Sequence, residues 1–190
     1  MELVFATNNA HKLQEVQAMV GEKFRIKSLA DIGCTADIPE TGVTFEENAQ
    51  QKTDYLFRHY QLDCFGDDSG LEVDALGKEP GVYSARYSGT RDMERNIDLV
   101  LEKLGDHPLR TARFRTVISL FLEGKQYFFE GAVEGQIITE RRGDAGFGYD
   151  PIFIPDGYEQ TFAEMSATEK NQISHRAEAI AKLVTFLRQR

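Results

Sequence analysis

The sequence predicts a mixed α/β fold, in which helices flank a sheet that holds both parallel and antiparallel strands. Early in the chain, short apolar runs alternate with segments of helical period, as in strand–helix units. In the second half, a long segment of alternating polarity turns back at Glu123-Gly124-Lys125, as in an antiparallel hairpin. A chain of 190 residues can form one domain with a sizeable core, or two small lobes around a cleft.

The first strand is expected over residues 2–6, and a polar loop over residues 7–12 joins it to a helix whose apolar face begins at Leu13. A helix N-terminus offers free backbone N–H groups and the positive end of the helix dipole, so a phosphate could bind there beside Lys12. The glycines of a Walker loop are absent, and junctions of this kind are also common without a ligand. A second short strand is expected over residues 24–29.

Thr44 and Glu47 have the spacing of a capping box and predict the start of the next helix, which is expected to run to about Tyr60. Lys52 lies on its apolar face. A lysine in that position more often snorkels from an edge, but it can equally reach an anion in a cleft. Asn48 on the same helix could cap or bridge backbone groups.

The second half of the chain is expected to combine strands with two further long helices. Ser166 and Glu169 have capping-box spacing, so Lys170 is expected in a short helical turn. His175 and Arg176 fall in the first turn of the last helix, where a cation opposes the helix dipole, and a broken rule of this kind is expected at a functional site. The expected elements are a helix over 93–104, strands over 112–122, 126–133, 136–139 and 152–154, and a final helix that begins at Ser174.

The composition is that of an ordinary globular protein, with 41% hydrophobic and 28% charged residues and no apolar run near the ~20 residues of a membrane-spanning helix. The segment Met1–Phe5 lacks the basic start of a signal peptide, which indicates a cytoplasmic protein and no membrane partner. Cys34 and Cys64 form neither a disulfide framework nor a zinc motif, so both are expected to be unreactive. The net charge of −9 argues against a nucleic-acid polymer as a partner but is compatible with a small phosphorylated ligand.

The segment Phe65–Leu71, F-G-D-D-S-G-L, follows a short apolar run that is typical of the end of a buried strand. Asp, Ser and Gly form turns, so these residues alone favour a polar turn. If the strand continues through them, Asp67 and Asp68 point to opposite faces, and one of the two is outward or structural. A carboxylate pair also suits Mg²⁺, which is usually held by one or two carboxylates plus substrate phosphates.

A second glycine-rich segment covers residues 141–151, with three glycines near two aromatic residues. Such a loop can let its backbone approach a flat ligand while a ring stacks on it. It can equally be a structural loop with Phe147 and Tyr149 in the core, and the segment alone does not separate the two interpretations.

Six motifs in fixed order resemble one family throughout, the inosine/xanthosine triphosphate pyrophosphatases, also called the HAM1-like family. One departure is Asn8, where many relatives have Gly; Asn tolerates left-handed backbone angles, so the loop is expected to survive. The motifs are T-x-N-x-x-K at 7–12, T-F-x-E-N-A-x-x-K at 44–52, D-D-S-G-L at 67–71, P-G-V-Y-S-A-R-Y-S-G at 80–89, F-G-Y-D-P at 147–151 and S-H-R at 174–176.

The resemblance implies an elongated, two-lobed α/β fold of the ITPase/Maf-like type, with a central substrate cleft, a single domain over residues 1–190 and a homodimer. It further implies Mg²⁺-dependent hydrolysis of ITP, dITP and XTP between the α- and β-phosphates, with release of the monophosphate and pyrophosphate. Such an activity removes deaminated purines from the nucleotide pool.

The same resemblance implies roles for individual residues. Asp68 is the acidic centre, as metal ligand or as proton acceptor for the attacking water, and Glu40 is a second metal ligand. The phosphates are held by Thr7, Asn8, Asn9, Ala10, His11 and Lys12, with help from Lys52. Ser69 contacts the substrate, and the nucleoside and base pocket is built from Phe147, Gly148, Tyr149, Asp150, Lys170, His175 and Arg176.

Two chemical expectations follow from these roles. A bound metal lowers the pKa of Asp68 and makes it a poorer base, so metal ligation with orientation of water is favoured. Selection is expected to rest on the 6-oxo group of the base, because donors from Arg176 or loop N–H groups satisfy that oxygen and would oppose the adenine 6-amino group.

Two other functions remain open on the sequence. A phosphatase with an aspartyl nucleophile drawn from Asp67 or Asp68 would release orthophosphate. A nucleotide-binding sensor would keep the pocket without turnover, although the set of Asp68, Lys12 and Lys52 argues against it.

Overall fold

The computed structural model describes residues 2–21 and 24–190, and their strands form one six-stranded sheet in the order β2-β1-β3-β4-β5-β6. Strand β1 pairs in parallel with β2 and with β3, whereas β5 pairs antiparallel with β6. The predicted mixed α/β fold is therefore confirmed. The strands are β1 (Glu2–Phe5), β2 (Arg25–Lys27), β3 (Cys64–Val73), β4 (Thr111–Leu122), β5 (Lys125–Ile137) and β6 (Phe153–Pro155).

Two of the helices begin where the sequence predicts their caps. The Thr44 hydroxyl accepts a hydrogen bond from the Glu47 N–H at 3.1 Å, and Ser166 and Glu169 form a complete capping box. The α-helices are α1 (Ala10–Val20), α2 (Phe45–Tyr60), α3 (Met93–Leu104), α4 (Ala167–Ile173) and α5 (His175–Arg188), and the short 3₁₀ helices are η1 (Ala30–Ile32), η2 (Asp74–Leu76), η3 (Gly81–Arg86) and η4 (Asp150–Ile152). Among the residues described, no helix combines the length and the apolar character needed to span a bilayer.

Three expectations about the strands need correction. The expected strand over 136–139 is not separate, because β5 continues without a break to Ile137. Gly135 interrupts the apolar pattern, yet its backbone pairs with Pro155 of β6, and a Cβ there would lie 2.2 Å from the Ile154 carbonyl oxygen. Strand β2 is shorter than the expected 24–29, and β6 lies one residue later than the expected 152–154.

The chain divides into two compact units, which are treated separately below. Unit 1 comprises Met1–Asp68, Thr116–Gly131 and Arg176–Arg190, and unit 2 comprises Ser69–Arg115 and Ala132–His175. The strands β3, β4 and β5 each contribute residues to both units.

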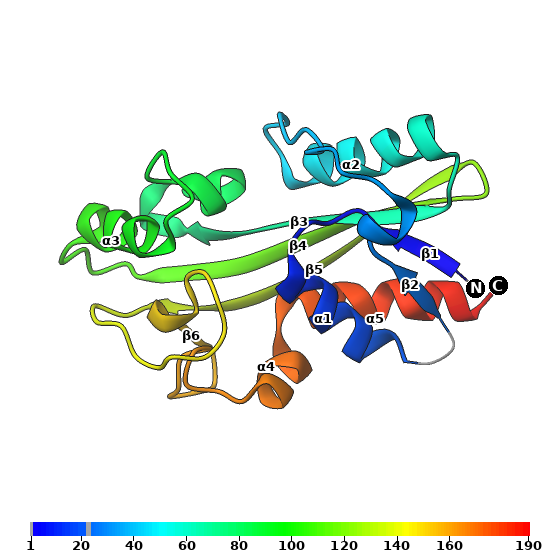
Figure 1. The fold of residues 1–190 in the computed structure, drawn as a ribbon. Helices are drawn as coiled ribbons and strands as arrows, with labels where there is room; N and C mark the ends of the chain where they lie inside the picture. Colours follow the sequence, from blue (N-terminus) through cyan, green and yellow to red (C-terminus); the bar gives the residue numbers. More distant parts are fainter. Residues whose placement is uncertain (1, 22–23) are drawn as a thin grey trace. The chain divides into compact units, whose positions relative to one another are not determined.

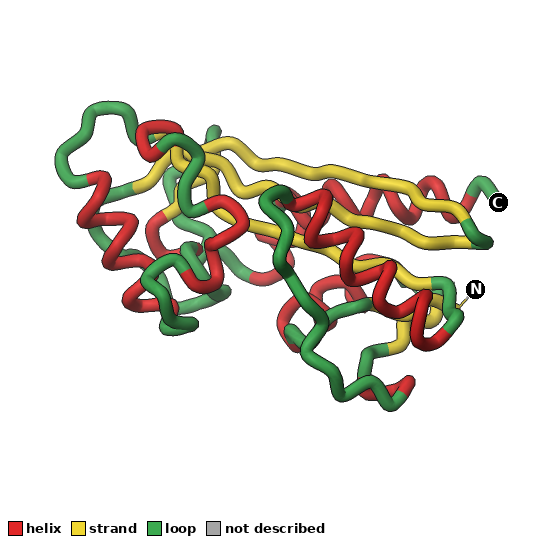
Figure 2. Tube along the Cα trace, turned by 90° about the horizontal axis from the view of Figure 1, so that it is seen from above, coloured by secondary structure: helices red, strands yellow, loops and turns green. Residues whose placement is uncertain are grey.

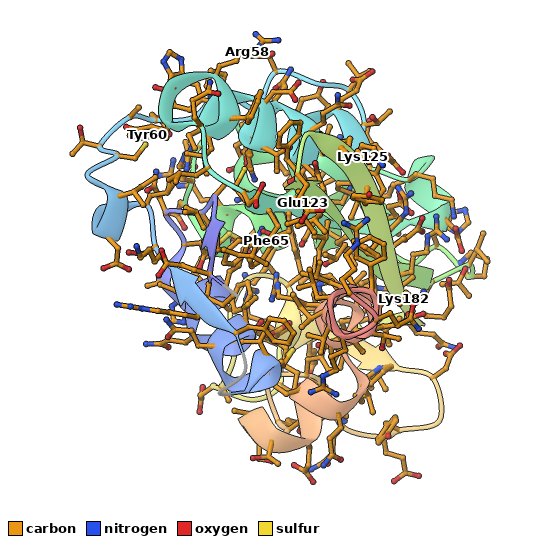
Figure 3. All side chains as sticks on the ribbon, turned by 90° about the vertical axis from the view of Figure 1, so that its right-hand side faces the viewer. Arg58, Tyr60, Phe65, Glu123, Lys125 and Lys182 are labelled. Atoms are coloured by element: carbon orange, nitrogen blue, oxygen red, sulfur yellow. The ribbon has the colours of Figure 1, made fainter. Side chains whose placement is uncertain are left out.

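In unit 1, helices cover both faces of the sheet, with α2 on one face and α1 and α5 on the other (Figure 1). The alternation along β3 explains this arrangement. Phe65 is fully buried among the apolar side chains of α1 and α5, as Figure 3 illustrates, whereas Cys64 packs with Leu56 of α2. Burial raises the pKa of the Cys64 thiol to about 12, so this thiol stays protonated at neutral pH.

The C-terminus of the chain is tied to the β4–β5 turn of unit 1 (Figure 2). Arg190 Nη1 lies 3.0 Å from a carboxylate oxygen of Glu123, and its guanidinium lies over the rings of Tyr127 and Phe186. Because Phe186 belongs to α5, these contacts help to hold that helix on the sheet.

Unit 2 has its own apolar core, in which one face of α3 packs against the second halves of β3 and β5 and the first residues of β4. Aromatic rings fill the centre of that core: Phe114 lies edge-on to Phe153 with centroids 4.7 Å apart, and Phe162 stacks on Phe114 at 5.9 Å. The loop after β5 inserts Tyr149 into the same core.

Candidate active site

The acidic segment lies inside strand β3, so the expected strand end or turn at Phe65–Leu71 is wrong. The reason is the close packing of α2 on this strand. A Cβ at Gly66 would lie 2.9 Å from Lys52 Cβ and 3.3 Å from the Ala49 carbonyl oxygen. Gly66 therefore serves close approach of a helix to an extended strand, which is a second common use of glycine beside turns.

The two adjacent carboxylates point to opposite faces of β3, as the period of a strand requires. Asp67 forms an ion pair with Lys12 Nζ of α1 at 3.0 Å and lies 3.6 Å from Arg176 Nε. Asp68 accepts a hydrogen bond from Asn48 Nδ2 of α2 at 3.0 Å. Both side chains are buried, and the ion pairs of Asp67 with Lys12 and Arg176 give that carboxylate a structural role.

Helix α2 brings a second cation to the same strand. Lys52 Nζ donates to the main-chain oxygen of Asp67 at 2.7 Å and pairs with the Glu40 carboxylate. The side chain is 8% exposed, so of the two expected placements Lys52 has the one that reaches into the site. Asn48, one helical turn earlier, accepts the Gly42 N–H at 2.7 Å and thus anchors the loop that carries Glu40.

These charges shift one another's ionisation. Burial raises the pKa of Asp68 above its ordinary value of 3.8, and the charges of Lys52 and Lys12 offset part of that rise. Burial also acts to raise the pKa of Asp67, but Lys12, Arg176 and Lys52 outweigh it and hold that pKa well below 3.8. Burial acts to lower the pKa of Lys52, and the surrounding carboxylates outweigh it, so Lys52 stays charged.

The N-terminus of α1 differs from the expectation of free backbone N–H groups. Asn9 is the N-cap, and its side-chain oxygen accepts from the N–H groups of His11 and Lys12 at 3.0 and 3.2 Å. The hydroxyl of Thr7 accepts the Asn9 N–H at 3.0 Å. A phosphate at this helix end would therefore share these donors with the Asn9 side chain, which moves the main phosphate interaction toward the Lys12 ammonium.

In unit 1, the carboxylates of Glu40 and Asp68 are the candidate ligands for a divalent cation. Across residues 2–21 and 24–190, no cluster of three or more His, Cys, Asp or Glu side chains is suited to holding a metal. Glu40 and Asp68 lie within electrostatic range, since repulsion from Glu40 contributes to the raised pKa of Asp68. Two carboxylates completed by substrate oxygens fit Mg²⁺, which seldom has an all-protein cage.

In unit 2, the second glycine-rich segment forms a loop that is anchored through Asp150. The Asp150 carboxylate accepts the Phe147 N–H at 2.9 Å and forms an ion pair with Lys170 Nζ of α4 at 2.7 Å. The Lys170 ammonium also lies 4.6 Å from the centroid of the Phe147 ring. Gly146 has φ +75°, and a Cβ there would meet the Asp150 carboxylate at 2.1 Å, so this position requires glycine.

The two aromatic residues of this loop have different surroundings, and the interpretation of a ring plugged into the core is confirmed for Tyr149 alone. Tyr149 is buried in the core, and its hydroxyl donates to the Ser84 carbonyl at 2.6 Å. Phe147 is partly exposed beside Lys170. Gly148 between them has φ +63°, a left-handed conformation.

The first turn of α5 supplies one residue to each unit. The His175 ring stacks on Phe114 in unit 2, with centroids 5.0 Å apart. Arg176 in unit 1 pairs with Glu15 of α1 as well as with Asp67. The cation that breaks the dipole rule is therefore compensated by two carboxylates.

The structure thus gathers the predicted residues into two groups. Unit 1 brings together Lys12, Glu40, Lys52, Asp67, Asp68 and Arg176; unit 2 gathers Phe147, Asp150 and Lys170, with Tyr149 behind them and Ser69 on β3. Sequence reasoning missed Glu15 and Ser84. The position of Glu15 three residues after Lys12, on the same side of a helix, could have indicated the first.

The chain is similar to known proteins over nearly its whole length. A family model described as the Ham1 family matches residues 3–186. A dITP/XTP pyrophosphatase of Christiangramia forsetii is 52% identical over 188 residues, covering 98% of this chain and 99% of the relative. A dITP/XTP pyrophosphatase of Bacillus subtilis is 46% identical over 191 residues, covering 98% and 96%.

Solved structures give the same result. The Ham1 protein of Staphylococcus aureus superposes with a TM-score of 0.92 at 40% identity, covering 100% of this chain and 99% of that protein. A HAM1 protein of Coxiella burnetii superposes with a TM-score of 0.93 at 38% identity, covering 100% of both chains. The resemblance drawn from six sequence motifs is confirmed, and the chain belongs to the Ham1 family.

Proposed function

We propose that this protein is a nucleoside triphosphate pyrophosphohydrolase that converts dITP, ITP and XTP to the monophosphate and pyrophosphate. The relatives named dITP/XTP pyrophosphatases, which match over nearly their whole length, support this activity. The observation that carries the proposal is the buried set of Lys12 and Lys52 around the carboxylates of β3. Acting in the cytoplasm as a homodimer with one catalytic domain over residues 1–190, the enzyme would remove deaminated purines from the nucleotide pool.

The triphosphate is assigned to unit 1. Phosphoryl transfer is mostly positioning and charge neutralisation, and two buried ammonium groups supply both. Lys12 and Lys52 are already held by Asp67 and Glu40, so their charges are in place before substrate binds. The loop residues Thr7, Asn8, Asn9, Ala10 and His11 line the start of α1 and would contact the phosphates beside Lys12.

Asp68 is assigned the central role at the reacting phosphorus. Asp68 and Glu40 would hold Mg²⁺, which would neutralise charge on the phosphate oxygens as the bond breaks. The hydrogen bond from Asn48 fixes one oxygen of Asp68 and leaves its orientation defined. Asp68 then orients the attacking water toward the α-phosphorus.

The base is assigned to unit 2. Phe147 offers a partly exposed ring for stacking, and the charge of Lys170 beside it is compensated by Asp150. Ser69, Gly148, Tyr149 and His175 complete the part of the substrate-binding set that lies in unit 2, and Arg176, which lies in unit 1, is assigned to the same set. Donors of this set, including Arg176 and loop N–H groups, would meet the 6-oxo group and reject the 6-amino group of adenine.

Product analysis tests the proposal. Purified protein is incubated with Mg²⁺ and dITP, ITP, XTP, dATP or dGTP, and pyrophosphate is resolved from orthophosphate. We expect pyrophosphate from the inosine and xanthosine substrates, little from dATP or dGTP, and loss of turnover in EDTA. Release of orthophosphate would instead establish the aspartyl phosphatase, and tight binding without any product would establish a sensor.

A further inference from the structure

Ser84 connects three segments of unit 2, although no role in substrate binding is assigned to it above. It lies in η3 and is 7% exposed. Its hydroxyl accepts the Leu71 N–H at 2.9 Å and donates to the Gly81 carbonyl at 2.6 Å. Its main-chain oxygen accepts the hydroxyl of Tyr149 at 2.6 Å.

Two of the connected segments, β3 and the loop after β5, carry residues that are assigned to base binding above. Leu71 follows Ser69 by two residues on β3. Tyr149 lies between Phe147 and Asp150, in the loop that is assigned to the base above. Ser84 therefore links the strand that presents Ser69 to the loop that presents Phe147.

We propose that the Tyr149–Ser84 contact is a positioning bridge for base recognition, and that Tyr149 acts through Ser84 instead of contacting the base. The proposal rests on the function proposed above and refines it. Tyr149 is 3% exposed and belongs to the apolar core of unit 2, so its ring faces the interior of that unit. The bridge sets where the loop of residues 146–150 stands relative to Ser69.

A second set of contacts, made by Asp150, also holds the loop, and the two sets of contacts fix different parts of it. Asp150 is held by Lys170 and by the Phe147 N–H, which fixes the turn itself. Tyr149 fixes the turn to the core and to η3. Without the tyrosine hydroxyl the ring can stay in the core while the loop shifts by a fraction of an ångström, which weakens the contacts of the loop with the base.

The variant Tyr149→Phe removes one oxygen atom and keeps the ring. We expect KM for dITP and XTP to rise about tenfold, with kcat within about twofold and with reduced selectivity over dGTP, because a loop shifted by less than 1 Å loses base contacts and leaves the phosphate groups of unit 1 in place. Tyr158→Phe is the matched control, since Tyr158 lies in the same unit and is 49% exposed. Unchanged KM and selectivity in Tyr149→Phe, or a fall in kcat alone, would overturn the bridge.

A measurement without substrate separates the bridge from the proposed function. In amide hydrogen exchange followed by NMR, Ser84→Ala should speed exchange at the Leu71 N–H, and Tyr149→Phe should speed exchange over residues 146–150. Wild-type exchange rates in both variants would refute the bridge whatever the enzyme hydrolyses. Failure of the wild-type protein to release pyrophosphate from any of the inosine or xanthosine substrates would refute the function and leave the exchange result standing.

Discussion

The two units build their groups of candidate residues by different means. In unit 1, most of the charged side chains project from helices and strands, and each lysine is held by a carboxylate: Lys12 by Asp67 of β3, and Lys52 by Glu40 in the loop before α2. In unit 2, one loop provides most of the groups, and its glycines and the ion pair between Asp150 and Lys170 shape it. Charge is concentrated in the first and aromatic surface in the second.

This difference matches the two ends of a nucleotide. A triphosphate demands positive charge at fixed positions, and helices and strands fix side chains better than loops do. A purine base demands a flat apolar surface with a few polar groups, which a glycine-rich loop can supply by close backbone approach. Changes in unit 1 are therefore expected to act on turnover, and changes in unit 2 on base selection.

The largest effect is expected for Asp68→Asn. The amide keeps the size of the side chain but loses the charge that orients water and would hold Mg²⁺, so kcat should fall about 10³-fold or more. Substrate binding should be largely retained. Steady-state kinetics and nucleotide titration measure the two effects, and Asp37→Asn, on an exposed carboxylate of the loop before Glu40, is the control. An active Asp68→Asn enzyme would remove Asp68 from the centre of the mechanism.

The second prediction compares two buried lysines, one in each unit. Lys52→Met and Lys170→Met each remove the lysine that pairs with a carboxylate. Lys170 and Asp150 are both buried, and breaking a buried pair costs about 3 kcal/mol or more of the free energy of unfolding. Glu40 is 32% exposed, so urea unfolding should show a smaller loss for Lys52→Met than for Lys170→Met. Kinetics should separate them, with Lys52→Met losing kcat on every substrate and Lys170→Met losing selectivity between dITP and dGTP. Equal kinetic profiles would mean that the two units do not divide the substrate in this way.

The elements of unit 1 could be predicted well from the sequence, and the reason is local. Capping residues at Thr44 and helical period defined α2, and the period of a strand placed Asp67 and Asp68 on opposite faces once the strand was known to continue. The continuation of β3 through Asp67 and Asp68 was missed, because a glycine such as Gly66 can indicate either a turn or the close approach of a helix. Only the packing of α2 distinguishes the two.

Contacts between segments that lie far apart in the sequence were harder to predict. Nothing in the loop sequence separated Phe147 from Tyr149, since the direction of each ring depends on the core of unit 2 and on Ser84, 65 residues earlier. The expectation of free N–H groups at the start of α1 was wrong, because the Asn9 side chain accepts hydrogen bonds from two of them. In both places a polar residue had several possible partners, and the tertiary structure selected one.

The third prediction concerns the pH dependence of folding stability in unit 1. The pKa of Asp67 is lower in the folded protein than its ordinary value of 3.8, so its ionised form stabilises the fold above that value, and the contribution is lost as pH falls through the folded pKa. Asp67→Asn should cost about 2 kcal/mol at pH 7, a typical value for charged hydrogen bonds. The gap between wild type and variant should hold from pH 7 to about 5 and narrow below 3.8.

Urea unfolding in EDTA at several pH values measures this gap without interference from metal binding. Asp37→Asn again provides an exposed carboxylate for comparison. A gap that widens as the pH falls would mean that Asp67 is protonated in the folded protein and that Lys12 has another counter-charge.

The smallest effects should come from substitutions at the helix caps. They bear on the comparison of the two units, because α2 carries Lys52 of unit 1 and α4 carries Lys170 of unit 2. Thr44→Ala and Ser166→Ala should each lower the free energy of unfolding by about 1 kcal/mol.

The kinetic effects of the two cap substitutions should differ. Helix α2 has 16 residues and is also held by Asn48 and Lys52, whereas α4 has only 7, far below the length at which a helix is stable alone. Loss of the α4 cap in Ser166→Ala should therefore release Lys170 locally, and KM for dITP should rise up to about fivefold, the equivalent of 1 kcal/mol. KM should change little in Thr44→Ala. Kinetics and amide exchange over residues 167–173 measure the difference, and a larger kinetic effect of Thr44→Ala would show that the site in unit 1 depends more on helix ends than on its ion pairs.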